Sequence, residues 1–183
     1  MTTYYDTPPR WPTLMIAIHW LTAFIVLTVF ALALSREFVE VKETRQLLLQ
    51  LHRYAGIIAF ALVLVRIPTR ITSKAPDHDF SGLTKLAAAA GHAALYIALA
   101  AIPLLGYLLT CARTGHVDFL GVPLPVLLER DRDVAETLEL YHSYAGWAML
   151  TIVGLHALAA LLHHHVFKDD VLKAMWPRNS QNG

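Results

Sequence analysis

The segment that decides the fold reads LYHSYAGWAMLTIVGLHALAALLHHHVF over residues 140–167 and contains no Asp, Glu, Lys or Arg. As a helix rising about 1.5 Å per residue, it exceeds the roughly 20 apolar residues that cross a bilayer. His142 and His156 stand fourteen positions apart within it. On a helix that spacing is about 21 Å along the axis and about 40° around it. The sequence therefore predicts two imidazoles that face the same way at two depths in a membrane.

The composition of the whole chain agrees with a membrane protein. Of its 183 residues 56% are hydrophobic and 16% are charged, whereas soluble domains carry about 25% charged residues. The net charge of +1 gives no reason to expect a nucleic-acid partner. We predict an all-α membrane protein in which residues 1–183 form one domain, a bundle of four transmembrane helices. The predicted helices cover residues 14–34, 47–67, 86–112 and 140–167.

The first of these helices has an alternative interpretation as a cleaved signal peptide, because Ala31-Leu32-Ala33 resembles a cleavage site. The apolar run of this helix, however, is longer than the roughly 7–15 residues of a signal peptide. The helix also contains His19. We therefore expect a retained helix. The Lys and Arg residues divide eight to seven between the two sides of the membrane, so the positive-inside rule barely favours cytoplasmic termini.

A short motif occurs twice in the chain. His52-Arg53-Tyr54-Ala55-Gly56 is repeated as His142-Ser143-Tyr144-Ala145-Gly146, and each copy lies near the start of a predicted helix. Each glycine follows its histidine by four residues, which places both on one helical face. The missing side chain leaves room for a flat macrocycle against the helix. Small residues also let membrane helices pack closely, so the glycines alone do not decide between the two interpretations.

Depth in the membrane pairs the histidines. His52 and His142 enter from the same side at similar depth, and His19 and His156 lie nearer the opposite side. A lone buried histidine is usually a hydrogen-bonded core residue, but four in two pairs favour haem iron ligation. The chain has no C-x-x-C-H motif, so we expect two non-covalent b-type haems enclosed by the bundle. Two imidazoles on each iron leave no open position, which suits electron transfer.

Further histidines lie in or beside the third and fourth helices. His92 could donate a hydrogen bond and a proton to a quinone headgroup at the lipid edge, or could simply join two helices. His163, His164 and His165 are consecutive, so they point in different directions on a helix. We expect them to lie at the membrane interface, with proton delivery as one role.

The chain resembles the bacterial cytochrome b561 family, and most closely its superoxide oxidase branch, from about residue 13 to residue 177. The resemblance is carried by Ile18-His19-Trp20, Leu51-His52, Gly91-His92, Gly154-Leu155-His156-Ala157, His163-His164 and Lys168-Asp169. It implies haem ligation by the same four histidines and a multi-pass protein of the bacterial inner membrane with cytoplasmic termini. It also implies oxidation of superoxide outside and reduction of ubiquinone in the membrane.

On this basis Arg53 is a candidate partner of a haem propionate, and Arg45 and Arg113 are candidates for attracting the superoxide anion. His92, His163 and Lys74 are candidates for quinone binding or proton delivery. One alternative function is that of an electron-transfer subunit whose donor is a partner dehydrogenase or hydrogenase docked on the loop before the fourth helix. Another alternative, without redox chemistry, is a small membrane scaffold or a metal transporter.

Overall fold

The computed structural model describes residues 10–76 and 82–177. Its long helices are α1 (Thr13–Ser35), α2 (Lys42–Thr72), α3 (Gly82–Thr114) and α4 (Arg132–Leu162). A 3-10 turn, η1 (Arg36–Phe38), follows α1; a π turn, η2 (His163–Phe167), and the short helix α5 (Val171–Ala174) follow α4. The strands β1 (Val117–Phe119) and β2 (Val122–Leu124) form a hairpin between α3 and α4.

Four helices are long and apolar enough to cross a membrane, as predicted. The first three predicted ranges lie within α1, α2 and α3, and the range 140–167 covers part of α4 together with η2. Helix α2 begins five residues earlier than predicted, at Lys42 rather than at residue 47, and α4 begins at Arg132 rather than at residue 140. The reason is that apolar composition marks the thickness of the lipid and not the end of the helix. A helix continues into water on charged residues until a cap ends it. At α4 that cap is Asp131, whose Oδ1 accepts from the backbone N–H of Val134 at 3.0 Å.

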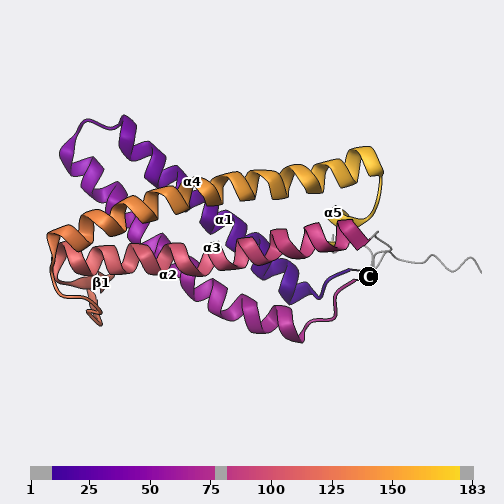
Figure 1. Cartoon of the computed structure of the whole chain (residues 1–183), viewed down its shortest axis with the longest axis horizontal. Coiled ribbons are helices and arrows are strands. Elements are labelled where there is room, and N and C mark those ends of the chain that lie inside the picture. The colour runs from indigo at the N-terminus through magenta and orange to yellow at the C-terminus, as the bar shows by residue number, and fades with distance from the viewer. Residues whose placement is uncertain (1–9, 77–81, 178–183) are drawn as a thin grey trace, which may run out of the picture.

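The helices form two antiparallel hairpins, α1 with α2 and α3 with α4, joined by packing of α2 on α3. Figure 1 shows α3 and α4 side by side along the long axis, with α1 and α2 crossing them obliquely. The α1–α2 turn and the β1–β2 hairpin lie at the same end, which we call the loop end. The start of α1 and helix α5 lie at the other, the terminal end.

An apolar layer fills the middle of the bundle. Val26, Val63, Leu99 and Met149, one from each long helix, pack together and are nearly fully buried. Met149 is midway along α4 between His142 and His156. The layer therefore separates the two histidine depths and excludes water between them.

The outer surfaces of the helices are apolar as well. Phe24, Ile97, Trp147 and Leu155 each expose more than half of their surface. Such an exposed apolar belt would be costly in water and is typical of helices that face lipid.

The terminal end is closed by a return of the chain after α4. The indole Nε1–H of Trp20 on α1 donates to the Met175 carbonyl at 2.7 Å, and the Trp11 N–H donates to the Ala174 carbonyl at 3.2 Å. These bonds fix the end of α5 against the start of α1.

Candidate functional site

His52 on α2 and His142 on α4 face one another at the loop end. Their ring centroids are 6.1 Å apart and their planes are at 85°. Each ring is held by its Nδ1–H: His52 donates to the Val29 carbonyl of α1 at 3.0 Å, and His142 donates to the Ile102 carbonyl of α3 at 3.1 Å. Those bonds leave each Nε2 lone pair available, which is the tautomer and orientation that a metal-ligating histidine adopts.

A cavity of about 560 Å³ surrounds this pair, well within the roughly 300–1,000 Å³ of small-molecule and cofactor sites. All four long helices line it, and the two glycines of the repeated motif, Gly56 and Gly146, lie on its wall. A Cβ atom added at either glycine would meet nothing within 4 Å. The open space beside both glycines is what the motif predicts for a flat group lying against α2 and α4.

A third glycine acts differently. A Cβ atom at Gly106 of α3 would lie 2.9 Å from Cε1 of His142, a distance that would force the ring to move. Gly106 therefore allows the His142 ring to approach α3 closely. The sequence reasoning missed this residue, because a glycine in a membrane helix carries no signal of which neighbour it accommodates.

His19 on α1 and His156 on α4 form the second pair, at the terminal end. Their ring centroids are 6.4 Å apart and their planes are at 60°. His92 on α3 contacts the same His156 ring at 5.6 Å between centroids. Its own Nδ1–H donates one turn back, to the Ala88 carbonyl at 2.7 Å. The structure thus brings His19, His92 and His156 together at the terminal end. The sequence had not indicated a partner histidine for His92.

A cation also contacts the terminal-end pair. Arg66 on α2 donates from Nη2 to Nδ1 of His19 at 2.8 Å and from Nε to the Tyr96 hydroxyl at 3.3 Å. Because a guanidinium has donors only, Nδ1 of His19 must accept. In the neutral ring the hydrogen is then on Nε2, which is the opposite tautomer to that of the loop-end pair. A metal could bind at Nε2 if the proton moved to Nδ1 and the contact with Arg66 broke, or if the proton were lost and the ring became an anionic imidazolate.

Both pair separations fit one iron between two imidazoles. A metal–nitrogen bond is about 2 Å and a ring centroid lies about 1 Å beyond the nitrogen, so two opposed ligands place their centroids about 6 Å apart. The observed 6.1 Å and 6.4 Å agree with this value. The loop-end donor set, with both Nε2 lone pairs available and the cavity beside it, therefore fits a six-coordinate haem iron. The terminal-end pair matches it in separation, and its His19 would match it in tautomer once Arg66 left Nδ1.

The tyrosine of the first motif holds the hairpin in place. The hydroxyl of Tyr54 donates to Oδ2 of Asp118 at 2.9 Å, and its ring contacts Phe119 with centroids 5.3 Å apart. Asp118 lines the cavity. The hairpin is thus attached at the mouth of the loop-end site. Tyr144, the equivalent residue of the second motif, is 66% exposed, so the repeat is not symmetric in its tyrosines.

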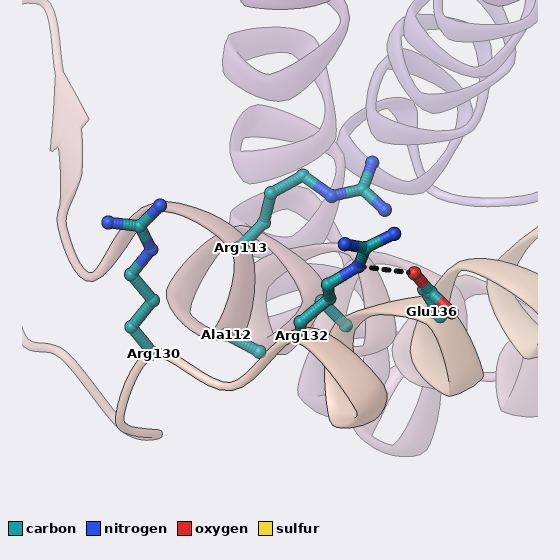
Figure 2. A pocket seen from close by; sticks show the side chains of 6 residues that line it. Ala112, Arg113, Arg130, Arg132 and Glu136 are labelled. Carbon is teal, nitrogen blue, oxygen red and sulfur yellow. Dashed lines mark hydrogen bonds and ion pairs between the residues drawn. The ribbon is translucent and has the colours of Figure 1, made fainter.

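A smaller hollow of about 300 Å³ lies at the loop end, between the end of α3 and the start of α4. Figure 2 shows Arg113 and Arg132 extending in a similar direction while Arg130 points away from them. Arg132 pairs with Glu136 at 2.9 Å, and Arg113 is bound by both oxygens of Glu139, at 3.1 Å and 2.6 Å. Two of these cations are therefore largely neutralised, which weakens the attraction for an anion that the sequence suggested for Arg113.

The other candidate residues lie at the expected ends. Arg53 is half-buried and lines the loop-end cavity. His163 at the terminal end is bonded through Nδ1 to Oδ2 of Asp169 at 2.5 Å. Lys74 is exposed just beyond the end of α2.

The comparison with known proteins agrees with this arrangement. Residues 10–178 match the family described as prokaryotic cytochrome b561. The chain belongs to this family. It is similar to "Cytochrome b561 homolog 2" of Escherichia coli (strain K12), at 32% identity over 183 residues that cover 98% of this chain and 97% of the relative.

Two further relatives cover nearly the same length. "Probable superoxide oxidase CybB" of Yersinia pestis is 31% identical over 176 residues, which are 92% of this chain and 97% of the relative. "Cytochrome b561 homolog 1" of Escherichia coli (strain K12) is 29% identical over 174 residues, 92% of this chain and 98% of the relative. As a family member, the protein is a multi-pass inner-membrane cytochrome, a four-helix bundle that binds b-type haem.

Proposed function

We propose that this cytochrome b561 transfers electrons from superoxide, on the periplasmic side, to ubiquinone in the membrane. The observation that carries the proposal is the presence of two imidazole pairs on either side of one apolar layer. The ring centroids are 6.1 Å apart in one pair and 6.4 Å apart in the other. The chain is similar over nearly its full length to a relative named as a probable superoxide oxidase. This similarity supports superoxide as the electron donor. The rival functions are an electron-transfer subunit, a scaffold and a metal transporter.

In this proposal two haems b are held by the two pairs, one by His52 with His142 and one by His19 with His156. Haem supplies one-electron transfer when it is bound, without an open coordination position. The backbone carbonyls of Val29 and Ile102 fix the loop-end rings. The glycines at positions 56 and 146 leave the space beside them.

The loop end is the donor side in this proposal, with the termini in the cytoplasm. Arg36 and Arg53 line the loop-end cavity, where they supply positive potential for an anion and a partner for a propionate. Each superoxide gives up one electron and leaves as oxygen. Two superoxides therefore reduce one ubiquinone, which takes up two protons to become ubiquinol.

The terminal end is the acceptor side. His92 is an exposed residue of α3, and its Nδ1–H is already donated to the Ala88 carbonyl. In this proposal its Nε2 donates to a quinone headgroup when the ring is protonated and accepts from a quinol hydroxyl when the ring is neutral. His163, bonded to Asp169, and exposed Lys74 supply protons from the cytoplasmic side. This assignment places proton uptake where the product quinol needs it.

The test supplies superoxide to the purified protein with ubiquinone and follows the haem absorption and quinol formation. We expect haem reduction faster than uncatalysed dismutation, and one quinol for every two superoxides consumed. Reduction no faster than dismutation would rule out superoxide as the donor. The variants are His92→Ala, which we expect to slow quinol formation but not haem reduction, and Glu43→Ala, at an exposed loop-end position outside the cavity, which we expect to leave quinol formation unchanged.

A second candidate function has one observation in its favour. The hairpin and the segment after it expose the apolar side chains of Leu120, Val122, Val126 and Leu127, a surface that a protein donor could cover. The protein would then be the electron-transfer subunit of a dehydrogenase or hydrogenase. Co-purification of a redox subunit that is lost in Leu120→Ser would favour this function over superoxide oxidation.

A further inference from the structure

The two ends of the bundle differ in net charge. Among residues 10–76 and 82–177, the loop-end half of the bundle holds seven cations and nine carboxylates. In the same ranges the terminal-end half holds two carboxylates, Asp169 and Asp170. Its cations are Arg10, Arg66, Arg70, Lys74, Lys85, Lys168 and Lys173. The described part of the terminal end is therefore strongly positive, whereas the loop end is slightly negative.

Both terminal-end carboxylates already have partners within the chain. Asp169 is bonded to His163 at 2.5 Å, and Asp170 is paired with Lys173 at 2.9 Å. In the part of the chain that the structure describes, three exposed cations of this end form no ion pair: Arg10, Lys74 and Lys168. Cations remain in excess even when the three carboxylates outside the described residues are counted, Asp6, Asp77 and Asp79. Positive charge is thus available to an anion from outside the chain.

A group of tryptophans marks the level at which this end meets the membrane surface. The rings of Trp20 and Trp176 meet edge to face with centroids 6.1 Å apart, and Trp11 stands just before the start of α1. Tryptophan side chains are enriched at the headgroup level of membranes. Leu14 at the start of α1 and Ile71 near the end of α2 expose 62% and 78% of their surface, as lipid-facing side chains do. The headgroups of the surrounding lipids therefore lie at this level.

Arg70 of α2 is held at the same level. Its guanidinium carbon lies 4.5 Å from the centroid of the Trp11 ring, so that the cation rests on the indole. A guanidinium carries five N–H donors, and among the described residues none of those of Arg70 has a hydrogen-bond acceptor. Arg10 directly precedes Trp11, and Lys74 follows Arg70 by four residues. We call these four residues, Arg10, Trp11, Arg70 and Lys74, the terminal patch.

We propose that the terminal patch binds the phosphate headgroup of an anionic phospholipid. The planar guanidinium of Arg70 has the geometry to bind two phosphate oxygens at once, and Arg10 and Lys74 add positive charge beside it. The acyl chains of the lipid then lie along the exposed apolar side chains of Leu14 and Ile71. A zwitterionic lipid such as phosphatidylcholine carries its own cation next to the phosphate, so the patch selects against it. The inference depends neither on haem nor on the identity of the electron donor.

The experiment measures lipid binding to the purified, delipidated full-length protein by native mass spectrometry. We expect a dissociation constant for phosphatidylglycerol at least about fivefold lower than that for phosphatidylcholine. Arg70→Gln and Lys74→Gln should each raise the phosphatidylglycerol constant about fivefold, the effect of one basic residue near an anionic lipid surface. Neither variant should change the phosphatidylcholine constant. Arg70→Lys, which keeps the charge but not the fork of donors, should have a smaller effect than Arg70→Gln.

Two controls separate this site from general attraction between charges. Arg132→Gln removes one cation at the loop end, where that residue is paired with Glu136 at 2.9 Å, and should leave both lipid constants unchanged. Excess inorganic phosphate, which lacks acyl chains, should not displace phosphatidylglycerol from the wild-type protein.

Several results would overturn the proposal. These are equal constants for the two lipids in the wild-type protein, an equal rise in Arg132→Gln and Arg70→Gln, and displacement of the lipid by inorganic phosphate. An unchanged phosphatidylglycerol constant in Arg70→Gln, with the helix content intact by circular dichroism, would also contradict it. If Arg70→Gln does not purify, Lys74→Gln decides in the same way, because Lys74 is exposed beyond the end of α2.

Discussion

The two histidine pairs have nearly the same separation but different surroundings. At the loop end, two backbone carbonyls orient the rings, and an open cavity lies beside them. At the terminal end, a guanidinium and a third histidine contact the pair. The common separation of about 6 Å indicates that both can hold the same kind of centre. The contacts around the two pairs differ in charge and in hydrogen bonding. Any centres that the pairs hold are therefore expected to differ in their electronic properties.

The largest expected effect comes from removing one ligand of each pair. In His142→Ala the loop-end haem should be lost and the haem content should fall from two per chain to about one. His156→Ala should lose the other haem, and the two remaining spectra should differ. The measurement is haem content with a reduced-minus-oxidised spectrum of each variant. Loss of both haems in each variant, with the fold intact by circular dichroism, would contradict two independent sites.

A smaller change should affect the loop-end pair alone. Gly106→Ala places a methyl group 2.9 Å from Cε1 of His142, and overpacking of this kind costs about 1–3 kcal/mol. We expect weaker haem retention at the loop end and an unchanged spectrum from the terminal end. Gly82→Ala is the control, because its Cβ would meet nothing within 4 Å. Equal behaviour of the two variants would show that the His142 ring does not depend on Gly106.

The two tyrosines of the repeated motif allow a matched test of the hairpin. Tyr54→Phe removes the hydrogen bond to Asp118, a loss of about 0.5–1.5 kcal/mol. Amide exchange in the hairpin strands should accelerate by roughly two- to twelve-fold, the factor equivalent to that energy. Tyr144→Phe, at a position that is 66% exposed, should leave the exchange rates unchanged. Equal rates in both variants would mean that the hydroxyl of Tyr54 does not hold the hairpin.

The smallest expected effect concerns the paired arginines at the loop end. Because Glu139 already binds Arg113, Arg113→Gln should change the rate with superoxide by less than about fivefold, equivalent to ~1 kcal/mol. The change should shrink as salt shortens the Debye length below about 10 Å. Arg132→Gln, which removes a more exposed pair with Glu136, should have no measurable effect. A large, salt-independent loss in Arg113→Gln would give that residue a direct role.

Much of the architecture could be predicted because the signals are local and strong. Long apolar windows give the four helices, although the second contains Arg53 and Arg66. The spacing of His142 from His156 gives two depths on one face. The depth argument also placed His52 beside His142 and His19 beside His156, as the structure does. That these four bind haem iron stays a prediction.

The remaining features depend on which side chains meet in space. The turn Phe119-Leu120-Gly121-Val122 lacks the Asn-Gly or Asp-Gly pair of a typical hairpin, so β1 and β2 carried no signal. Arg66 was counted only as one charge near a membrane boundary. Its contact with His19 depends on how α1 and α2 are rotated about their own axes where they pack together. The spacing of residues in the sequence does not determine that rotation.

The central claim is that each chain holds two b-type haems in two separate imidazole pairs. The most direct measurement is a reduced-minus-oxidised spectrum of the purified protein, with haem quantified per chain and titrated against potential. We predict two haems b per chain and two one-electron steps. One haem per chain, or none, would contradict the claim.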